Sequence, residues 1–117
     1  MTGMFSQLNI LNNAIRGVSE NHRVVSQNIA NVNTPGYKTQ RLDFDQLTEL
    51  LESANTPDDA ISKVTVKTVE GLAERADGNN VDLEREVSQM KKNALLFQAY
   101  AQLLASKLDS MRQAMTT

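Results

Sequence analysis

The sequence predicts an all-α fold in which long N- and C-terminal helices form an antiparallel coiled-coil hairpin, with a small irregular or short-strand connector between them. Apolar residues recur at alternating intervals of three and four near both ends, and a cluster of asparagine, proline and glycine interrupts this pattern after the first helix. Aromatic residues make up only 4% of the 117 residues, which makes a large compact core difficult to build. We expect the N-terminal helix over 1–31, a turn motif and acidic connector over 32–80, and the C-terminal helix over 81–117.

Both terminal regions carry a heptad pattern of apolar residues. We predict that these residues, here called the seam, pair the two helices within one chain. The only histidine, His22, falls on the same pattern, so we expect it to be a packed or partner-bonded side chain rather than a ligand or a base. The predicted seam consists of Leu8, Leu11, Ile15, Val18, Val25 and Ile29 in the first helix and Val87, Met90, Phe97, Leu104, Leu108 and Met111 in the second.

A second apolar stripe runs beside the seam. A two-helix hairpin would leave this stripe exposed to water, so it is either part of a broad core face in a monomeric bundle or an interface with neighbouring subunits. Seam burial offsets only part of the entropy that is lost when two long helices become ordered, so these helices should need packing partners, either a third helix or other subunits. The predicted inter-subunit stripe consists of Ile10, Ala14, Gly17, Val24, Leu96, Tyr100 and Leu103.

The stretch NIANVNTPGYK is a helix-stop signal. Either Asn31 or Asn33 could take the left-handed conformation that ends a helix, Pro35 prevents continuation, and Pro35-Gly36 favours a tight turn before Tyr37. The predicted motif consists of Asn28, Asn31, Asn33, Thr34, Pro35, Gly36 and Tyr37.

The connector is acidic and short. Residues 43–86 hold twelve acids and four bases, a net charge of −8, so the flanking regions carry +6. The helical spacing of DFDQLTELLESAN, over 43–55, predicts a short helix, and the alternation in SKVTVKTVEG, over 62–71, predicts a short strand or extended arm. The second long helix should begin after DGNN, with Asn80 or Asp82 as its N-cap.

The sequence predicts no catalytic, cofactor-binding or metal site, and no enzyme. The chain has no cysteine, and the acidic stretch from Asp77 lacks the glycine and the final bidentate acid of a calcium loop. Scattered bases without interleaved aromatics argue against nucleic-acid binding, and short apolar runs argue against insertion into a lipid bilayer. The first residues lack the basic and then apolar build of a cleaved signal peptide.

Two separated motifs, NIANVNTPGYK and DGNNVDLEREVSQMKKNALLFQAYAQLLASKLDSMRQAM, resemble the axial proteins of the bacterial flagellum, and most closely the proximal-rod members of its basal-body rod family. The resemblance covers about residues 4–44 and 77–115. It implies a structural subunit of the proximal rod in the periplasmic space, which polymerises through its terminal helices into a helical or ring assembly. It also implies contact with other rod and basal-body subunits, and passage through the flagellar export apparatus without a cleaved signal peptide.

A second class of protein would also expose apolar stripes on helices. A helical export chaperone or adaptor that binds partner helices is therefore the alternative, although it would have no need of the NTPGYK turn. Filament formation on concentration would separate the two classes.

Overall fold

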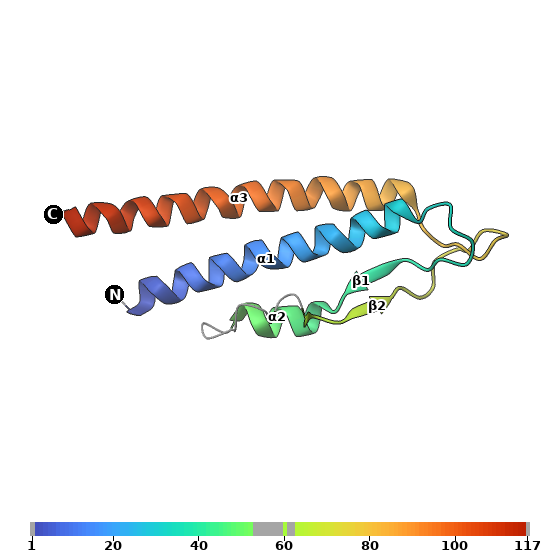
Figure 1. Cartoon of the computed structure of the whole chain (residues 1–117), viewed down its shortest axis with the longest axis horizontal. Helices are drawn as coiled ribbons and strands as arrows, with labels where there is room; N and C mark the ends of the chain where they lie inside the picture. The colour runs from blue at the N-terminus through green and yellow to red at the C-terminus, as the bar shows by residue number, and fades with distance from the viewer. Residues whose placement is uncertain (1, 53–59, 61–62, 117) are drawn as a thin grey trace.

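A computed structural model of the chain describes residues 2–52, 60 and 63–116. The elements follow in the order α1 (Thr2–Ala30), β1 (Gln40–Leu42), α2 (Phe44–Glu52), β2 (Val66–Thr68) and α3 (Leu83–Thr116). The two long helices run side by side in opposite directions, so both ends of the chain lie at the same end of the molecule (Figure 1). The molecule measures 66 × 23 × 18 Å. The expected fold of two long helices with a small connector is therefore present, and the connector contains a two-stranded sheet.

Helix α1 occupies the middle of three layers. Helix α3 lies on one side of it, whereas α2 and the two strands lie on the other (Figure 1). A helix with neighbours on two sides buries a broad face, and the buried positions of α1 accordingly spread beyond one heptad stripe. They are Asn13, Gly17, Val24, Val25 and Asn28.

The apolar core lies between α1 and the connector. Val24 packs with Leu42, Leu47 and Val64, and Leu50 and Val66 lie against this cluster. The connector therefore contributes most of the side chains in the core, a role for which its acidic composition gave no indication.

Besides Val24, Gly17 of α1 also contacts Leu47 of α2. A Cβ added at Gly17 would stand 3.2 Å from Cδ1 of Leu47, which is tighter than ordinary van der Waals contact. Gly17 and Val24 had been predicted to face a neighbouring subunit, and the structure corrects this because the side chains that cover them come from the same chain.

The sheet pairs β1 with β2 antiparallel, with Gln40 opposite Thr68 and Leu42 opposite Val66. Strand β2 lies inside the segment predicted to be extended, whereas β1 carries too short a pattern to be predicted. Helix α2 lies within the expected helical segment 43–55, of which 53–55 lie outside the described residues.

Asp43 is the N-cap of α2. Its Oδ1 accepts a hydrogen bond from the backbone N–H of Gln46 at 3.3 Å, and its carbonyl accepts one from Leu47 at 3.0 Å. Lys67 from β2 also lies 3.2 Å from the carboxyl group of Asp43. These hydrogen bonds and the neighbouring ammonium group lower the pKa of Asp43 below its ordinary value, the bond from Gln46 having the largest effect.

Helix α3 is rotated relative to the predicted seam. The positions of α3 that are buried or half-buried are, among others, Glu86, Asn93, Leu96, Tyr100, Leu104 and Met111. This face is turned by roughly 60° from the predicted seam, at about 100° per residue. The seam residues Val87, Phe97 and Leu108 are consequently exposed, and the structure corrects their assignment to intramolecular packing.

Polar residues explain this rotation. Asn21 Nδ2 donates to Asn93 Oδ1 at 3.0 Å. Seven residues later in α1, Asn28 Nδ2 donates at 3.1 Å to Oε2 of Glu86, which lies seven residues earlier in α3. The contact between α1 and α3 thus contains two hydrogen-bonded pairs of polar side chains, which the apolar periodicity does not predict.

Candidate functional site

The turn motif ends α1 in two steps. The backbone N–H of Asn31 donates to Gln27 O at 3.1 Å, and the side chain of Asn31 donates to the same carbonyl at 2.8 Å. Tyr37 N then donates to Thr34 O at 3.2 Å, which closes a tight turn over Pro35 and Gly36. Gly36 has φ +75°, as the third position of a type II turn requires.

The Pro35-Gly36 turn forms as predicted, but the asparagine prediction was wrong. Among the described residues only glycines have a positive φ, so neither Asn31 nor Asn33 is left-handed. The side chain of Asn31 instead bonds back to the last turn of α1, and Gly36 takes the left-handed conformation.

Asn28 is the hub of this region, with only 1% of its surface exposed. Its Nδ2 donates to Gln40 O at 2.9 Å and to Glu86 Oε2 at 3.1 Å. Its Oδ1 accepts from the hydroxyl of Tyr37 at 2.9 Å and from the backbone N–H of Gln40 at 3.0 Å. These four bonds use both donors and both lone pairs of the amide, so Asn28 joins α1, the turn, β1 and α3.

Glu86 brings the first turn of α3 into the same cluster. It is 2% exposed, and its Oε1 has no hydrogen-bond partner among the described residues. Burial, and to a smaller extent the charge of Glu86, raise the pKa of the Tyr37 hydroxyl. The hydroxyl therefore stays protonated and remains a donor to Asn28 over a wide range of pH.

The DGNN segment completes the cluster from the other side. Asn79 Nδ2 donates to Asn31 O at 2.9 Å and to Thr34 O at 2.8 Å, which ties the DGNN segment to the turn that follows α1. Asn80 Oδ1 accepts from Thr39 N at 2.6 Å, and Asn80 O accepts from Thr39 Oγ1 at 3.2 Å. We call this network the clasp; its members are Asn28, Asn31, Thr34, Tyr37, Thr39, Gln40, Asn79, Asn80 and Glu86.

The clasp uses asparagines that the sequence analysis had treated separately. Asn80 was considered only as an N-cap, but Asp82 has that role, since its Oδ1 accepts from Arg85 N at 3.4 Å and its carbonyl accepts from Glu86 N at 3.0 Å. Asn79 and Glu86 were not identified as site residues. The signal for Asn79 was the occurrence of two asparagine-rich segments, one at the end of α1 and one before the start of α3.

Turns at Gly36 and Gly78 bring the NIANVNTPGYK and DGNN segments together. Gly36 N donates to Asp77 O at 2.8 Å, and Gly78, with φ +84°, lies so close that a Cβ added there would stand 3.5 Å from Gly36 Cα. Lys38 Nζ donates to the carboxyl group of Glu74 at 2.6 Å and also to Gly78 O.

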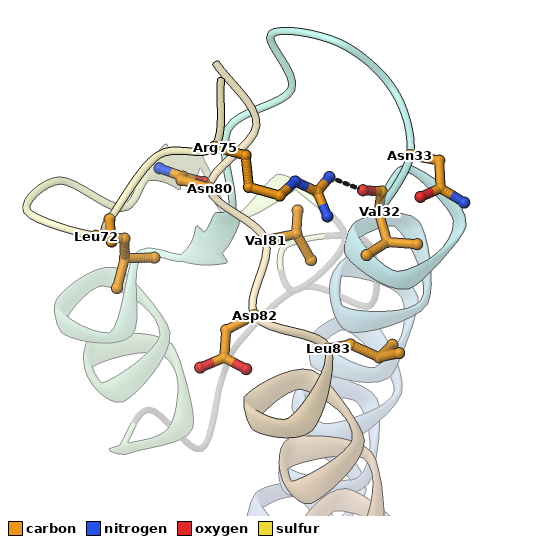
Figure 2. A pocket seen from close by; sticks show the side chains of 9 residues that line it. Val32, Asn33, Leu72, Arg75, Asn80, Val81, Asp82 and Leu83 are labelled. Atoms are coloured by element: carbon orange, nitrogen blue, oxygen red, sulfur yellow. Dashed lines mark hydrogen bonds between the residues drawn. The ribbon is translucent and has the colours of Figure 1, made fainter. Parts of the chain in front are cut away.

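An open cleft of about 620 Å³ lies beside the clasp. Figure 2 shows Arg75 reaching across it from the connector to the carbonyl of Val32, just beyond the end of α1, with Val81 and Leu83 on the side of α3. The cleft is lined by Val32, Asn33, Leu72, Ala73, Arg75, Asn80, Val81, Asp82 and Leu83. Arg75 thus supplies another donor to the carbonyls at this end of α1.

The predicted inter-subunit stripe is divided by the structure. Gly17 and Val24 are buried, Ala14, Leu96 and Tyr100 are half-buried, and Ile10 and Leu103 are exposed. Leu103 is 50% exposed, and Leu95, which lies outside the predicted stripe, is 68% exposed.

The predicted seam residues of α1 are more covered than those of α3. Val25 is buried, and Leu8, Leu11, Ile15, Val18 and Ile29 are half-buried. In α3, Met90, Leu104 and Met111 are half-buried, whereas Phe97 is 44% exposed. His22 is exposed rather than packed, because the contact line of α1 is turned away from the heptad position that it occupies.

An apolar groove of about 340 Å³ lies between α1 and α3. It is lined by Val18, Ser19 and His22 from α1 and by Asn93, Ala94, Phe97 and Gln98 from α3. Exposed apolar surface on two long helices is typical of a protein that packs against other subunits.

The described residues offer little for chemistry. They contain no group of three or more histidine, aspartate or glutamate side chains that could hold a metal ion. None of the described helices combines the length and apolar character needed to cross a membrane.

Comparison with known proteins supports an assembly role. The sequence profile of the family described as "Flagella basal body rod protein" matches residues 11–38, which span most of α1 and the turn motif. The chain is 28% identical over 116 residues to the flagellar basal body rod protein FlgB of Bacillus subtilis, covering 91% of this chain and 90% of that protein.

Two further relatives have the same description. The chain is 28% identical over 120 residues to FlgB of Aquifex aeolicus, covering 94% of this chain and 93% of the relative, and 28% identical over 111 residues to FlgB of Salmonella typhimurium, covering 80% of each. The three matches cover 80–94% of this chain. The chain is thus similar over most of its length to flagellar basal-body rod proteins, which are structural proteins and not enzymes, and this similarity supports a structural rod subunit.

Proposed function

We propose that this structural rod subunit polymerises through α1 and α3 in the proximal part of the rod, and that the clasp holds the two helices in the arrangement that makes this possible. The partners are further copies of the chain and other rod and basal-body subunits. In the same proposal the chain passes through the flagellar export apparatus without a cleaved signal peptide and assembles in the periplasmic space.

The observation that carries this proposal is the exposed apolar surface of α3. Helix α3 contacts the chain mainly through α1, and Leu95, Phe97, Leu103 and Leu108 are largely exposed. Burial of a leucine or phenylalanine side chain contributes roughly 1.5–3 kcal/mol, so covering these four side chains would supply several kcal/mol to assembly.

The clasp supports the proposal in a second way. It is a buried polar network, which fixes one arrangement of α1 relative to α3 more strictly than apolar packing does. A rod that transmits torque needs subunits whose helices are held at a fixed register, and the bond between Asn28 and Glu86 provides such a constraint.

The test compares three aspartate variants in a strain that lacks the chain. Leu103→Asp removes exposed apolar surface from α3, and we expect normal helicity of the monomer but loss of the subunit from purified basal bodies and loss of motility. Leu104→Asp lies on the half-buried side and should lower the stability of the monomer itself. Asn12→Asp adds the same charge to an exposed polar position of α1 and should leave both properties unchanged.

Two results would count against the proposal. One is normal incorporation of the Leu103→Asp variant into basal bodies. The other is a loss of helicity in Leu103→Asp as large as in Leu104→Asp, which would assign Leu103 to the packing of the monomer.

A further inference from the structure

The chain contains a single Asp–Gly pair, Asp77-Gly78, and this pair lies in the turn through which the DGNN segment joins the clasp. None of the other four glycines follows an aspartate or an asparagine. In an Asp–Gly pair the backbone nitrogen of the glycine can attack the aspartate side chain, because a residue without a Cβ leaves that nitrogen unhindered. Asp77 is therefore the aspartate of this sequence that is most prone to isomerisation.

The reaction consists of two balanced steps. The nitrogen of Gly78 forms a bond to Cγ of Asp77 and loses its proton, while the hydroxyl of the protonated carboxyl group leaves with that proton as water, which closes a succinimide ring. Water then opens the ring at one of its two carbonyl groups. Opening at Cγ restores aspartate, whereas opening at the backbone carbonyl leaves the chain linked through the side chain of Asp77. The second product is isoaspartate, which adds one methylene to the main chain.

The folded turn opposes ring closure. Gly78 N donates to Arg75 O at 2.9 Å, and Gly36 N donates to Asp77 O at 2.8 Å, so the peptide group that must rotate is held at both of its polar atoms. The carboxyl group of Asp77 is also held, because its Oδ1 accepts from Asn79 N at 3.0 Å and lies 3.8 Å from Nε of Arg75. Ring closure breaks these contacts and therefore needs local opening of the turn.

The clasp requires both members of the reactive pair. Gly78 has φ +84°, a conformation that residues with a side chain rarely adopt. Asp77 supplies the side-chain acceptor for Asn79 N and the carbonyl acceptor for Gly36 N. The geometry of the clasp thus places a reactive Asp–Gly pair at this turn.

Isoaspartate at this position is incompatible with the clasp. Asn79 is 0% exposed and donates to Asn31 O and to Thr34 O, and the additional methylene just before it displaces its side chain from both acceptors. The carbonyl oxygen that Gly36 N reaches becomes part of a free carboxylate. A buried amide that loses both acceptors is unfavourable.

We propose that Asp77-Gly78 is a site of spontaneous isoaspartate formation, that the closed clasp suppresses the reaction, and that a chain isomerised while the turn is open can no longer close the clasp.

The test measures isoaspartate in the full chain by mass spectrometry of its proteolytic peptides, with electron-transfer fragmentation to distinguish isoaspartate from aspartate. In guanidinium chloride, isoaspartate should accumulate at Asp77 at least about tenfold faster than in native buffer, because the reaction needs an open turn. Asp109, which precedes a serine in α3, gives the rate for an aspartate that no glycine follows.

Two variants loosen the turn without denaturant. Asn79→Ala removes both side-chain bonds of the buried amide and should raise the rate at Asp77 in native buffer at least about threefold. Lys38→Met removes the contact of the ammonium group with Gly78 O and should raise the rate to a smaller extent, which gives a second reading if Asn79→Ala does not fold. Asn33→Ala, at an exposed position, is the matched control and should leave the rate unchanged.

A second measurement follows the isomerised chain itself. Separated by reversed-phase chromatography and refolded, it should have a lower free energy of unfolding than the unmodified chain carried through the same treatment. Asp77→Ser keeps a side-chain oxygen for the turn but cannot form the ring, so incubation in guanidinium chloride should leave its melting temperature after refolding unchanged.

Each part of the proposal has a result that would overturn it. Accumulation at Asp77 no faster than at Asp109 in the unfolded chain would show that the pair is not the reactive site. Equal rates in native buffer and in guanidinium chloride, or rates in Asn79→Ala and Lys38→Met that match Asn33→Ala, would show that the clasp does not suppress the reaction. An isomerised chain that refolds with unchanged stability would show that the clasp tolerates isoaspartate.

Discussion

Asn28, two residues before the end of α1, donates a hydrogen bond of 3.1 Å to Glu86 in the first turn of α3. Both side chains are buried, and 58 residues of sequence separate them. The bond fixes the C-terminal end of one long helix against the N-terminal end of the other. A shift of either helix by one turn would break this bond and leave the buried carboxyl group of Glu86 without its donor.

The first prediction concerns Asn28. Asn28→Ala removes all four hydrogen bonds of the amide and leaves the buried carboxyl group of Glu86 without its donor. We expect the free energy of unfolding to fall by about 3 kcal/mol or more, because removing one partner of a buried polar pair is costly. Urea unfolding followed by circular dichroism measures this change. Asn33→Ala, at an exposed position of the same turn, should change stability by no more than about 0.5 kcal/mol. Equal effects of the two substitutions would show that the clasp does not stabilise the fold.

The second prediction concerns the hydroxyl of Tyr37. Tyr37→Phe removes its donor to Asn28 and should lower the free energy of unfolding by about 1 kcal/mol at neutral pH. Since the folded state raises the pKa of Tyr37 above its ordinary 10.0, the folded chain holds more protons than the unfolded chain between the two values. Stability of the natural chain should therefore decrease as the pH rises above 10, and Tyr37→Phe should show a smaller decrease. Unfolding curves at several alkaline pH values test this, and parallel decreases would contradict it.

The third prediction concerns the stability of the chain at acidic pH, to which Asp43 contributes. Asp43 has a lowered pKa because the N–H of Gln46 and then Lys67 favour its charged form. Its contribution to stability is complete above the ordinary pKa of 3.8 and is lost as the pH falls through the lowered value in the folded chain. Asp43→Asn can still cap α2 but cannot titrate, so its stability should vary less with pH in this acidic range. Thermal unfolding between neutral and strongly acidic pH measures the difference. Identical pH profiles would show that the charge of Asp43 does not contribute.

The fourth prediction concerns Gly17, which lies against Leu47 of α2. Gly17→Glu would place a charged side chain in the apolar contact between α1 and α2, so we expect it to destabilise the monomer by about 2 kcal/mol or more. Gly17→Ala should change stability by less than about 1 kcal/mol, because better helix propensity compensates for a small movement of Leu47. Thermal melting of the dilute monomer gives both values. If Gly17→Glu has a normal melting temperature but fails to assemble, Gly17 lies at an interface between subunits, as the sequence predicted.

Local signals in the sequence were sufficient for the main elements. The apolar repeats predicted both long helices, the Pro35-Gly36 pair predicted the turn, and the position of Asp82 before an amphipathic segment made it one of two candidates for the N-cap of α3. Each of these features depends on residues close together in the chain, where helix periodicity and capping rules apply.

The way in which these elements pack against one another could not be predicted from the same signals. Phe97 and Leu108 lie on the apolar repeat, but the contact between α1 and α3 contains the polar pairs Asn21–Asn93 and Asn28–Glu86, so α3 is rotated and both residues are exposed. Val24 is covered by the connector because Leu42 and Val64 reach it through a short sheet, whose pairing joins residues far apart in sequence. Tertiary contacts of this kind override a local pattern.

A structure of the assembled basal body, at a resolution that shows the side chains of the rod, gives the most direct test of assembly through α3. The quantity to measure is the exposed surface of Phe97 and Leu103, which are 44% and 50% exposed in the single chain. We predict that helices of adjacent subunits cover both side chains and that the bond between Asn28 and Glu86 is retained. If both side chains remain as exposed in the rod as in the single chain, α3 does not form the interface and the account is wrong.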